Sequence, residues 1–220
     1  MRVGILLTSN HPNVKDPRQG ALWMIERATA ARRAALDSLF VGDQHVSATP
    51  YYQNTPMLGR LFAEWGKAPA GCLFLLPLWH PVLMAEQIGT LAAIAQGRLI
   101  MQCGLGWGEA RFAAMGAHIR TRPSAFEEAL DIVRRLLAGE TVSSSRRFRI
   151  AEASLALRPA EPVAVWIASP GLASEERARR PTCIASAAPL TAERQAPSSC
   201  GATSTSASRR PRHERCCSRG

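Results

Sequence analysis

The chain has 220 residues, a net charge of +10 and 46% hydrophobic residues, a length that allows one full domain. Its first residues hold too few apolar side chains for a secretory signal, and the run "GCLFLLPLWHP" is broken by Pro77 and too short to span a membrane, so we expect a soluble, cytoplasmic protein. Residues 1–170 carry 18 basic and 13 acidic residues without a basic stripe, which argues against nucleic-acid binding.

Short apolar runs alternate with helical patterns along residues 1–170. We expect strands at residues 2–7, 38–42, 72–76, 98–103 and 163–168, helices at 19–36, 55–66, 81–97 and 124–139, and a small hairpin or excursion at 147–157. The strand runs are continuously apolar, which is typical of strands buried on both faces of a parallel sheet. The pattern predicts an α/β fold that is either a doubly wound sheet or a (β/α)8 barrel.

Two helix starts carry local signals. Pro81 can occupy the first turn of the third helix, since its missing N–H is not needed there. Ser124 and Glu127 have the spacing of a capping box, in which a hydroxyl and a carboxylate bond the first free amides of a helix. Gly139 would end that helix.

The stretch "CGLGWGEARF" follows the fourth predicted strand and raises the question of a nucleotide-binding loop. The dinucleotide fingerprint requires a third glycine where this chain has Glu109, and it usually follows the first strand of a domain. A loop at the carboxyl-terminal mouth of a barrel fits better, because glycines let the backbone approach a ligand closely. The alternative is a simple turn, with Trp107 capping the core.

Residues 1–170 resemble the bacterial-luciferase-like (LLM class) family of flavin- or deazaflavin-dependent oxidoreductases. The resemblance rests on "VGDQH", on "LPLWHPVLMAEQIGTLAAIAQGRLIMQCGLGWGEARFAAMG" and on "AFEEALDIVRRLL"; Ala93 departs from an Asp that is common in the family. It implies a (β/α)8 barrel that uses reduced FMN or a deazaflavin at its mouth to transform a small organic substrate. Many members are monooxygenases that work with a separate flavin reductase.

The resemblance also implies a set of site residues. His45 and Asp43 would face the cofactor and substrate, with His45 transferring protons because imidazole titrates near neutral pH; a purely structural His45–Asp43 pair is the alternative. The implied cofactor-binding residues are Leu75, Leu76, Gly104, Gly106, Trp107, Gly108, Glu109 and Ser169. For Glu109 the alternative is a surface carboxylate that opens the next helix. The histidines lack metal-ligand spacing, so no metal site is expected.

Residues 171–220 differ in character from the rest of the chain. They hold nine Arg, four acidic residues and none of the aromatic residues Trp, Phe and Tyr, so we expect a disordered basic tail, or translation out of frame after residue 170. A barrel needs eight strands, and the pattern predicts five, so we expect an incomplete barrel. The chain could therefore be inactive, or a non-catalytic fragment that persists by self-association as a homo-oligomer.

Overall fold

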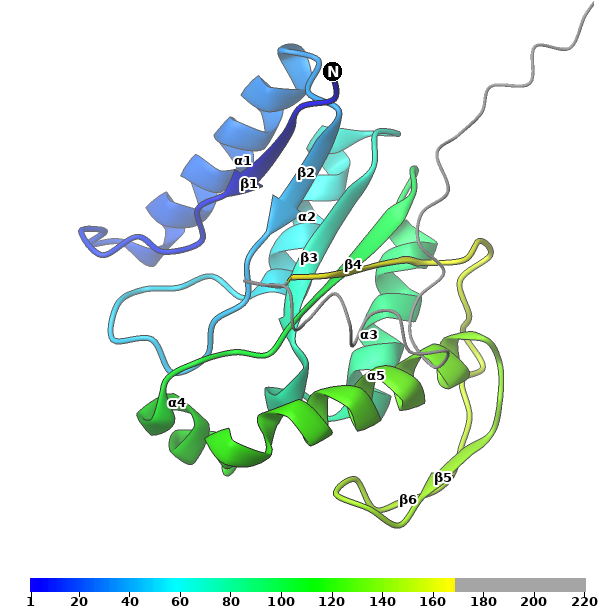
Figure 1. Ribbon diagram of the computed structural model, residues 1–220. Coiled ribbons are helices and arrows are strands. Elements are labelled where there is room, and N and C mark those ends of the chain that lie inside the picture. Colours follow the sequence, from blue (N-terminus) through cyan, green and yellow to red (C-terminus); the bar gives the residue numbers. More distant parts are fainter. Residues whose placement is uncertain (169–220) are drawn as a thin grey trace, which may run out of the picture. The chain divides into compact units, whose positions relative to one another are not determined.

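A computed structural model of the chain describes residues 1–168, in which the central element is a five-stranded parallel sheet (Figure 1). Its strands are β1 (Gly4–Leu7), β2 (Ser38–Val41), β3 (Ala70–Leu75), β4 (Leu99–Gly104) and β7 (Ala164–Ile167). They lie in the order β1-β2-β3-β4-β7, and each pairs in parallel with its neighbour. This order confirms the barrel-type prediction, because in a doubly wound sheet the later strands would lie on the other side of β1 from β2.

Helices connect the strands. They are α1 (Pro17–Arg33), α2 (Asn54–Trp65), α3 (Pro81–Ile94), α4 (Glu109–Ala114) and α5 (Arg122–Leu137), with short 3-10 turns η1 (Leu76–Leu78) and η2 (Ile119–Thr121). Figure 1 shows α1, α2 and α3 on the same face of the sheet, while α5 packs against α3 and η1. This is the arrangement that right-handed β–α–β crossovers produce.

The helix-facing side of the sheet forms the core. Val41, Cys72 and Met101 are at most 1% exposed, and Trp65 of α2 is fully buried. Removing one large apolar side chain from water contributes about 1.5–3 kcal/mol. These contacts explain why strands with continuous apolar runs form here.

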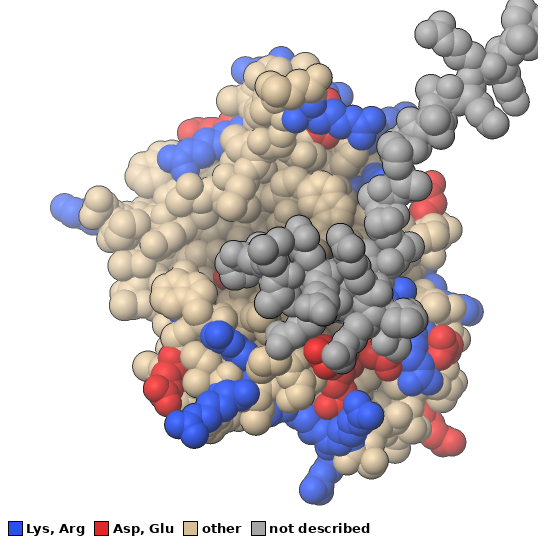
Figure 2. All heavy atoms as spheres, in the orientation of Figure 1, with Lys and Arg blue, Asp and Glu red and all other residues tan. Residues whose placement is uncertain are grey.

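The opposite face of the sheet is more open in the part of the chain described. Leu6 is 65% exposed and Trp166 is 42% exposed, although the Trp166 ring lies 5.3 Å from the ring of Phe40. On the side seen in Figure 2, Lys and Arg side chains are dispersed among Asp and Glu around the rim rather than gathered into a stripe. The exposed Leu6 and Trp166 side chains make part of this face apolar.

The predicted capping box at Ser124 is wrong. Helix α5 begins two residues earlier, at Arg122, with Pro123 in its first turn, and Thr121 at the N-cap makes no side-chain cap bond. The Ser124 hydroxyl instead donates to the Thr121 carbonyl at 3.0 Å. Proline suits the first helical turn through its fixed φ and its missing N–H, so the helix starts at the proline rather than at the serine.

The predicted hairpin is present but shifted toward the N-terminus. Strands β5 (Val142–Ser144) and β6 (Ile150–Ala153) pair antiparallel, so the hairpin overlaps the predicted 147–157 in part. Ser169 and the predicted tail, residues 171–220, lie outside the described residues. None of the helices among residues 1–168 has the length and apolarity needed to cross a membrane.

Candidate active site at the carboxyl edge of the sheet

The predicted site residues within residues 1–168 follow three neighbouring strands. Asp43 and His45 come just after β2, Leu75 and Leu76 lie where β3 ends, and the loop from Gly104 follows β4. Because the strands are parallel, their carboxyl ends share one edge of the sheet. The fold thus brings segments about 30 residues apart in the chain to a common location, which is where barrel enzymes carry their chemistry.

Asp43 and His45 form a close pair. The side chain of Asp43 is completely buried and that of His45 is 14% exposed, with Oδ1 of Asp43 3.3 Å from Nε2 of His45. The two atoms are near enough for an ion pair but are not aligned for a hydrogen bond, and neither has a hydrogen-bond partner elsewhere in residues 1–168. A buried polar atom without a partner costs free energy, so the absence of hydrogen bonds at Oδ1 and Nε2 requires a physical explanation.

The second oxygen of Asp43 is fully used within the protein. Oδ2 accepts hydrogen bonds from the backbone N–H of Leu75 at 2.7 Å and from Nε1 of Trp79 at 2.8 Å. Asp43 therefore ties the end of β2 to the end of β3 and to the turn that follows it. The alternative of a structural role, which the sequence left open for this pair, has direct support for Asp43.

Leu75 and Leu76 contribute backbone rather than side chains to this edge. Leu75 is 7% exposed and Leu76 is fully buried in the core. Any ligand that rests on them must therefore contact mainly the peptide groups at the end of β3. The structure places both residues at the predicted edge, but not as an apolar side-chain surface.

Packing and backbone conformation favour glycine at the positions that end and follow β4. A Cβ on Gly104 would lie 3.2 Å from Leu75 Cδ2, and one on Gly106 would lie 3.2 Å from the Phe112 ring. Gly106 and Gly108 also have positive φ values, +71° and +92°, which glycine adopts without strain. Packing and backbone conformation thus account for these glycines without a ligand.

Trp107 extends from this loop toward solvent and does not cap the core. It is 67% exposed, and the guanidinium of Arg111 lies 4.6 Å from its ring centre. Arg111 also donates to the Trp107 carbonyl at 3.3 Å, and Arg122 donates to the Gly106 carbonyl at 3.0 Å. Two arginines from the following helices therefore hold the loop. Glu109 is an exposed residue in the first turn of α4, as its alternative interpretation predicted.

Sequence reasoning missed several polar residues at the same edge. Trp79 was not singled out, although it lies in the turn after β3 and bonds Asp43. Ser9 and His11 follow β1, are buried, and have side-chain atoms without a well-formed hydrogen bond. Asn54, fully buried at the start of α2, donates to the Leu73 carbonyl at 2.6 Å. Their common signal was position, since each lies shortly after a strand or at the start of a helix.

Burial and the charge of Asp43 affect two nearby ionisable groups. Burial raises the pKa of the Tyr51 phenol, Asp43 adds to that rise, and the adjacent Ser9 hydroxyl opposes it. Burial, with additions from Asp43 and Cys103, raises the pKa of the Cys72 thiol well above its usual value. Both groups are therefore neutral at physiological pH, and neither is suited to act as a base or nucleophile there.

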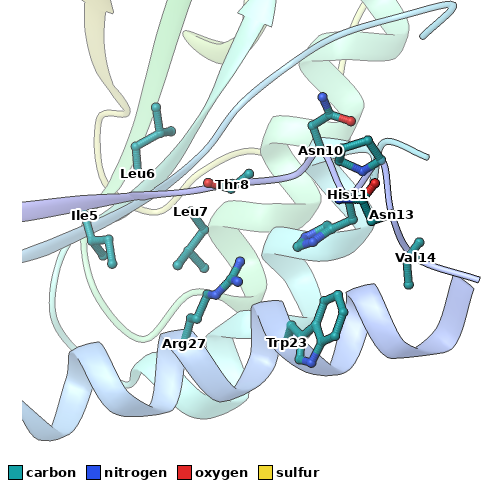
Figure 3. A pocket seen from close by; sticks show the side chains of 11 residues that line it. Ile5, Leu6, Leu7, Thr8, Asn10, His11, Asn13, Val14, Trp23 and Arg27 are labelled. Carbon is teal, nitrogen blue, oxygen red and sulfur yellow. The ribbon is translucent and has the colours of Figure 1, made fainter. Parts of the chain in front are cut away.

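A separate cavity of about 460 Å³ lies beside β1. Trp23 and Arg27 reach into it from α1, and His11 points into the same space from the segment after β1 (Figure 3). None of the predicted site residues within residues 1–168 lines this cavity. Its walls follow the edge of β1 that is not paired in the described sheet, so we do not place the His45 chemistry there.

The sheet order, the crossover helices and a polar pair at the carboxyl edge define a β/α-barrel type of enzyme scaffold. The profile of the family described as "Luciferase-like monooxygenase" matches residues 1–196 of the chain. The chain belongs to this luciferase-like monooxygenase family.

Individual relatives agree with that assignment. An F420-dependent glucose-6-phosphate dehydrogenase of Intrasporangium calvum is 28% identical over 162 residues, which cover 67% of this chain and 48% of that protein. The chain thus spans about half the length of the curated relatives it matches.

Two solved structures show the same fold. The monooxygenase RslO1 from Streptomyces bottropensis superposes with a TM-score of 0.71 at 22% identity, covering 81% of this chain and 56% of that one. The oxygenating constituent of 3,6-diketocamphane monooxygenase from Pseudomonas putida, in complex with FMN, gives a TM-score of 0.64 at 18% identity, covering 76% of this chain and 51% of that one.

Proposed function

We propose that the protein is an oxidoreductase that uses reduced FMN or a deazaflavin to transform a small organic substrate at the carboxyl edge of its sheet. The observation that carries the proposal is the close Asp43–His45 pair in a luciferase-like chain. Its facing atoms, Oδ1 and Nε2, lack hydrogen-bond partners in the described residues. Relatives that depend on F420 or contain FMN support the choice of cofactor class.

The residues present fit such a cofactor in two respects. The peptide groups at the end of β3 and the glycines at positions 104, 106 and 108 allow a flat ring to approach the backbone. The His45 side chain is partly exposed at the same edge, within reach of a bound molecule. Bound there, the reduced ring would supply the hydride or the reaction with oxygen, which the protein itself cannot supply.

In this proposal His45 moves the proton. Asp43 lies beside Nε2, so the other ring nitrogen, Nδ1, remains for a hydrogen bond to the substrate. Imidazole is suited to accept or donate a proton near neutral pH. Asp43 would orient the ring rather than react, because its Oδ2 is already occupied by two donors.

The test is a binding titration of the full chain with FMN and with F420, oxidised and reduced, followed by fluorescence. We expect one of the two to bind, and His45→Ala to retain most of the affinity while losing turnover. Glucose 6-phosphate is the first substrate to assay with F420, because the curated relatives act on it. His118→Ala, which removes a histidine of the short turn before α5, is the matched control. Absence of binding by either cofactor would refute the proposal.

A second candidate function is a non-catalytic unit that associates with itself. Leu6 and Trp166 are exposed on β1 and β7, the outer strands of the described sheet, and this favours it. The unpaired edge of an outer strand can pair with another chain. Light scattering on the same samples separates the candidates: a defined oligomer that binds neither cofactor supports the second, whereas cofactor binding supports the first.

A further inference from the structure

The turn between β3 and α3, residues 76–80, carries an indole that points back to the candidate site. Trp79 donates through Nε1 to Oδ2 of Asp43 at 2.8 Å. Its ring also meets the His45 ring edge to face, with centroids 5.5 Å apart, and the Phe74 ring at 5.2 Å. One side chain therefore contacts both members of the pair and the strand beneath them.

The contacts of Asp43 show what this bond controls. Oδ2 receives two donors, Trp79 Nε1 and the Leu75 N–H, which together prevent rotation of the carboxylate. As a result Oδ1 is the oxygen that faces His45. A hydrogen bond to an ionised acceptor is roughly twice as strong as one between neutral groups, so this arrangement is well held.

We infer that Trp79 is a positioning residue: its indole N–H and ring fix both the Asp43 carboxylate and the His45 imidazole, and with them the Leu75–Leu76 peptide on which a cofactor ring would rest. This inference rests on the proposed function for its catalytic meaning. Nothing else in the described residues would hold Oδ2 from the side of the turn.

The chain contains a second indole that serves as a matched control. Trp65 also donates through Nε1, to the Pro69 carbonyl at 3.1 Å, and it is fully buried. Its bond joins the end of α2 to the segment before β3, away from Asp43. Replacing either tryptophan by phenylalanine keeps an aromatic ring and removes one N–H donor, so the two variants differ chiefly in which bond is lost.

The experiment compares Trp79→Phe with Trp65→Phe in the full chain. We expect the Leu75 amide to exchange with solvent about tenfold faster in Trp79→Phe, because its acceptor becomes mobile. Trp65→Phe should lower the melting temperature without that local change. In Asp43→Asn the Trp79 indole N–H resonance should shift, whereas the Trp65 resonance should not.

Cofactor titration of the same variants gives the functional readout. We expect Trp79→Phe to weaken binding of FMN or F420 severalfold and Trp65→Phe to leave it unchanged. Equal effects of both variants on Leu75 exchange would overturn the inference, as would intact affinity in Trp79→Phe when the wild type binds. If the wild type binds neither cofactor, the proposed function fails, and the exchange and resonance data alone decide whether Trp79 fixes Asp43.

Discussion

Replacing Asp43 by alanine should measurably lower the stability of the fold. The change leaves the buried Leu75 N–H and the half-buried Trp79 Nε1–H without their acceptor. A buried donor without a partner costs about 1–3 kcal/mol, and the part-buried indole N–H costs less. Removing a buried carboxylate whose Oδ1 lacks a hydrogen bond returns part of this cost. We therefore expect a net loss of about 2 kcal/mol, against a total of about 5–15 kcal/mol for a typical domain.

The assay is urea denaturation followed by circular dichroism, with the slope of the transition checked for each variant. Asp43→Asn keeps one carbonyl acceptor and should lose about half as much. Asp131→Ala removes a carboxylate that is 49% exposed and should change stability by less than about 0.5 kcal/mol. The structural role of Asp43 in joining the ends of β2 and β3 would be refuted if Asp43→Ala had the same free energy of unfolding as the wild type. It would also be refuted if Asp131→Ala lowered that free energy as much as Asp43→Ala does.

Two further predictions concern glycine packing and tyrosine ionisation. Gly71→Ala should destabilise the chain by about 1–3 kcal/mol or more, since the new Cβ would lie 2.0 Å from the Ile100 carbonyl oxygen. Gly59→Ala in α2, whose Cβ would meet nothing nearer than 3.8 Å, should instead stabilise the chain by about 0.5–1 kcal/mol. Equal melting temperatures for the two variants would contradict both predictions. In a Tyr52→Phe background, the phenolate absorbance of Tyr51 should appear above pH 10.0, because burial raises its pKa. Folding favours the protonated phenol, so its contribution to stability is complete below pH 10.0 and is lost as the pH rises through the folded-state pKa; a midpoint at or below 10.0 would refute this.

Strand positions and their order were predictable from the sequence, because strands buried in a parallel sheet appear as short, continuously apolar runs. Apolar runs such as residues 98–103 and 72–76 appear as β4 and β3 with boundaries moved by one or two residues. The helix starts were less predictable where two local signals competed. At α5 the proline signal at Pro123 prevailed over the capping-box spacing at Ser124.

The candidate site, too, was predictable from the sequence only in part. Asp43 and His45 could be singled out from the sequence, because two polar residues directly after a buried strand stand out and the segment resembles a family motif. The hydrogen bond from Trp79 to Asp43 joins residues 36 positions apart, and the sequence pattern of neither segment predicts it. Such a bond depends on how two adjacent strands end and where the following turn places its side chain.

Residues 1–168 thus determine locally where strands and helices form, since periodicity, prolines and glycines act over a few neighbouring residues. The tertiary structure alone decided which oxygen of Asp43 is occupied, that Leu76 is buried rather than presented to a ligand, and that Trp107 extends into solvent. These outcomes depend on contacts between segments that are distant in the chain. They are set when parallel strands align their carboxyl ends, which happens only in the folded protein.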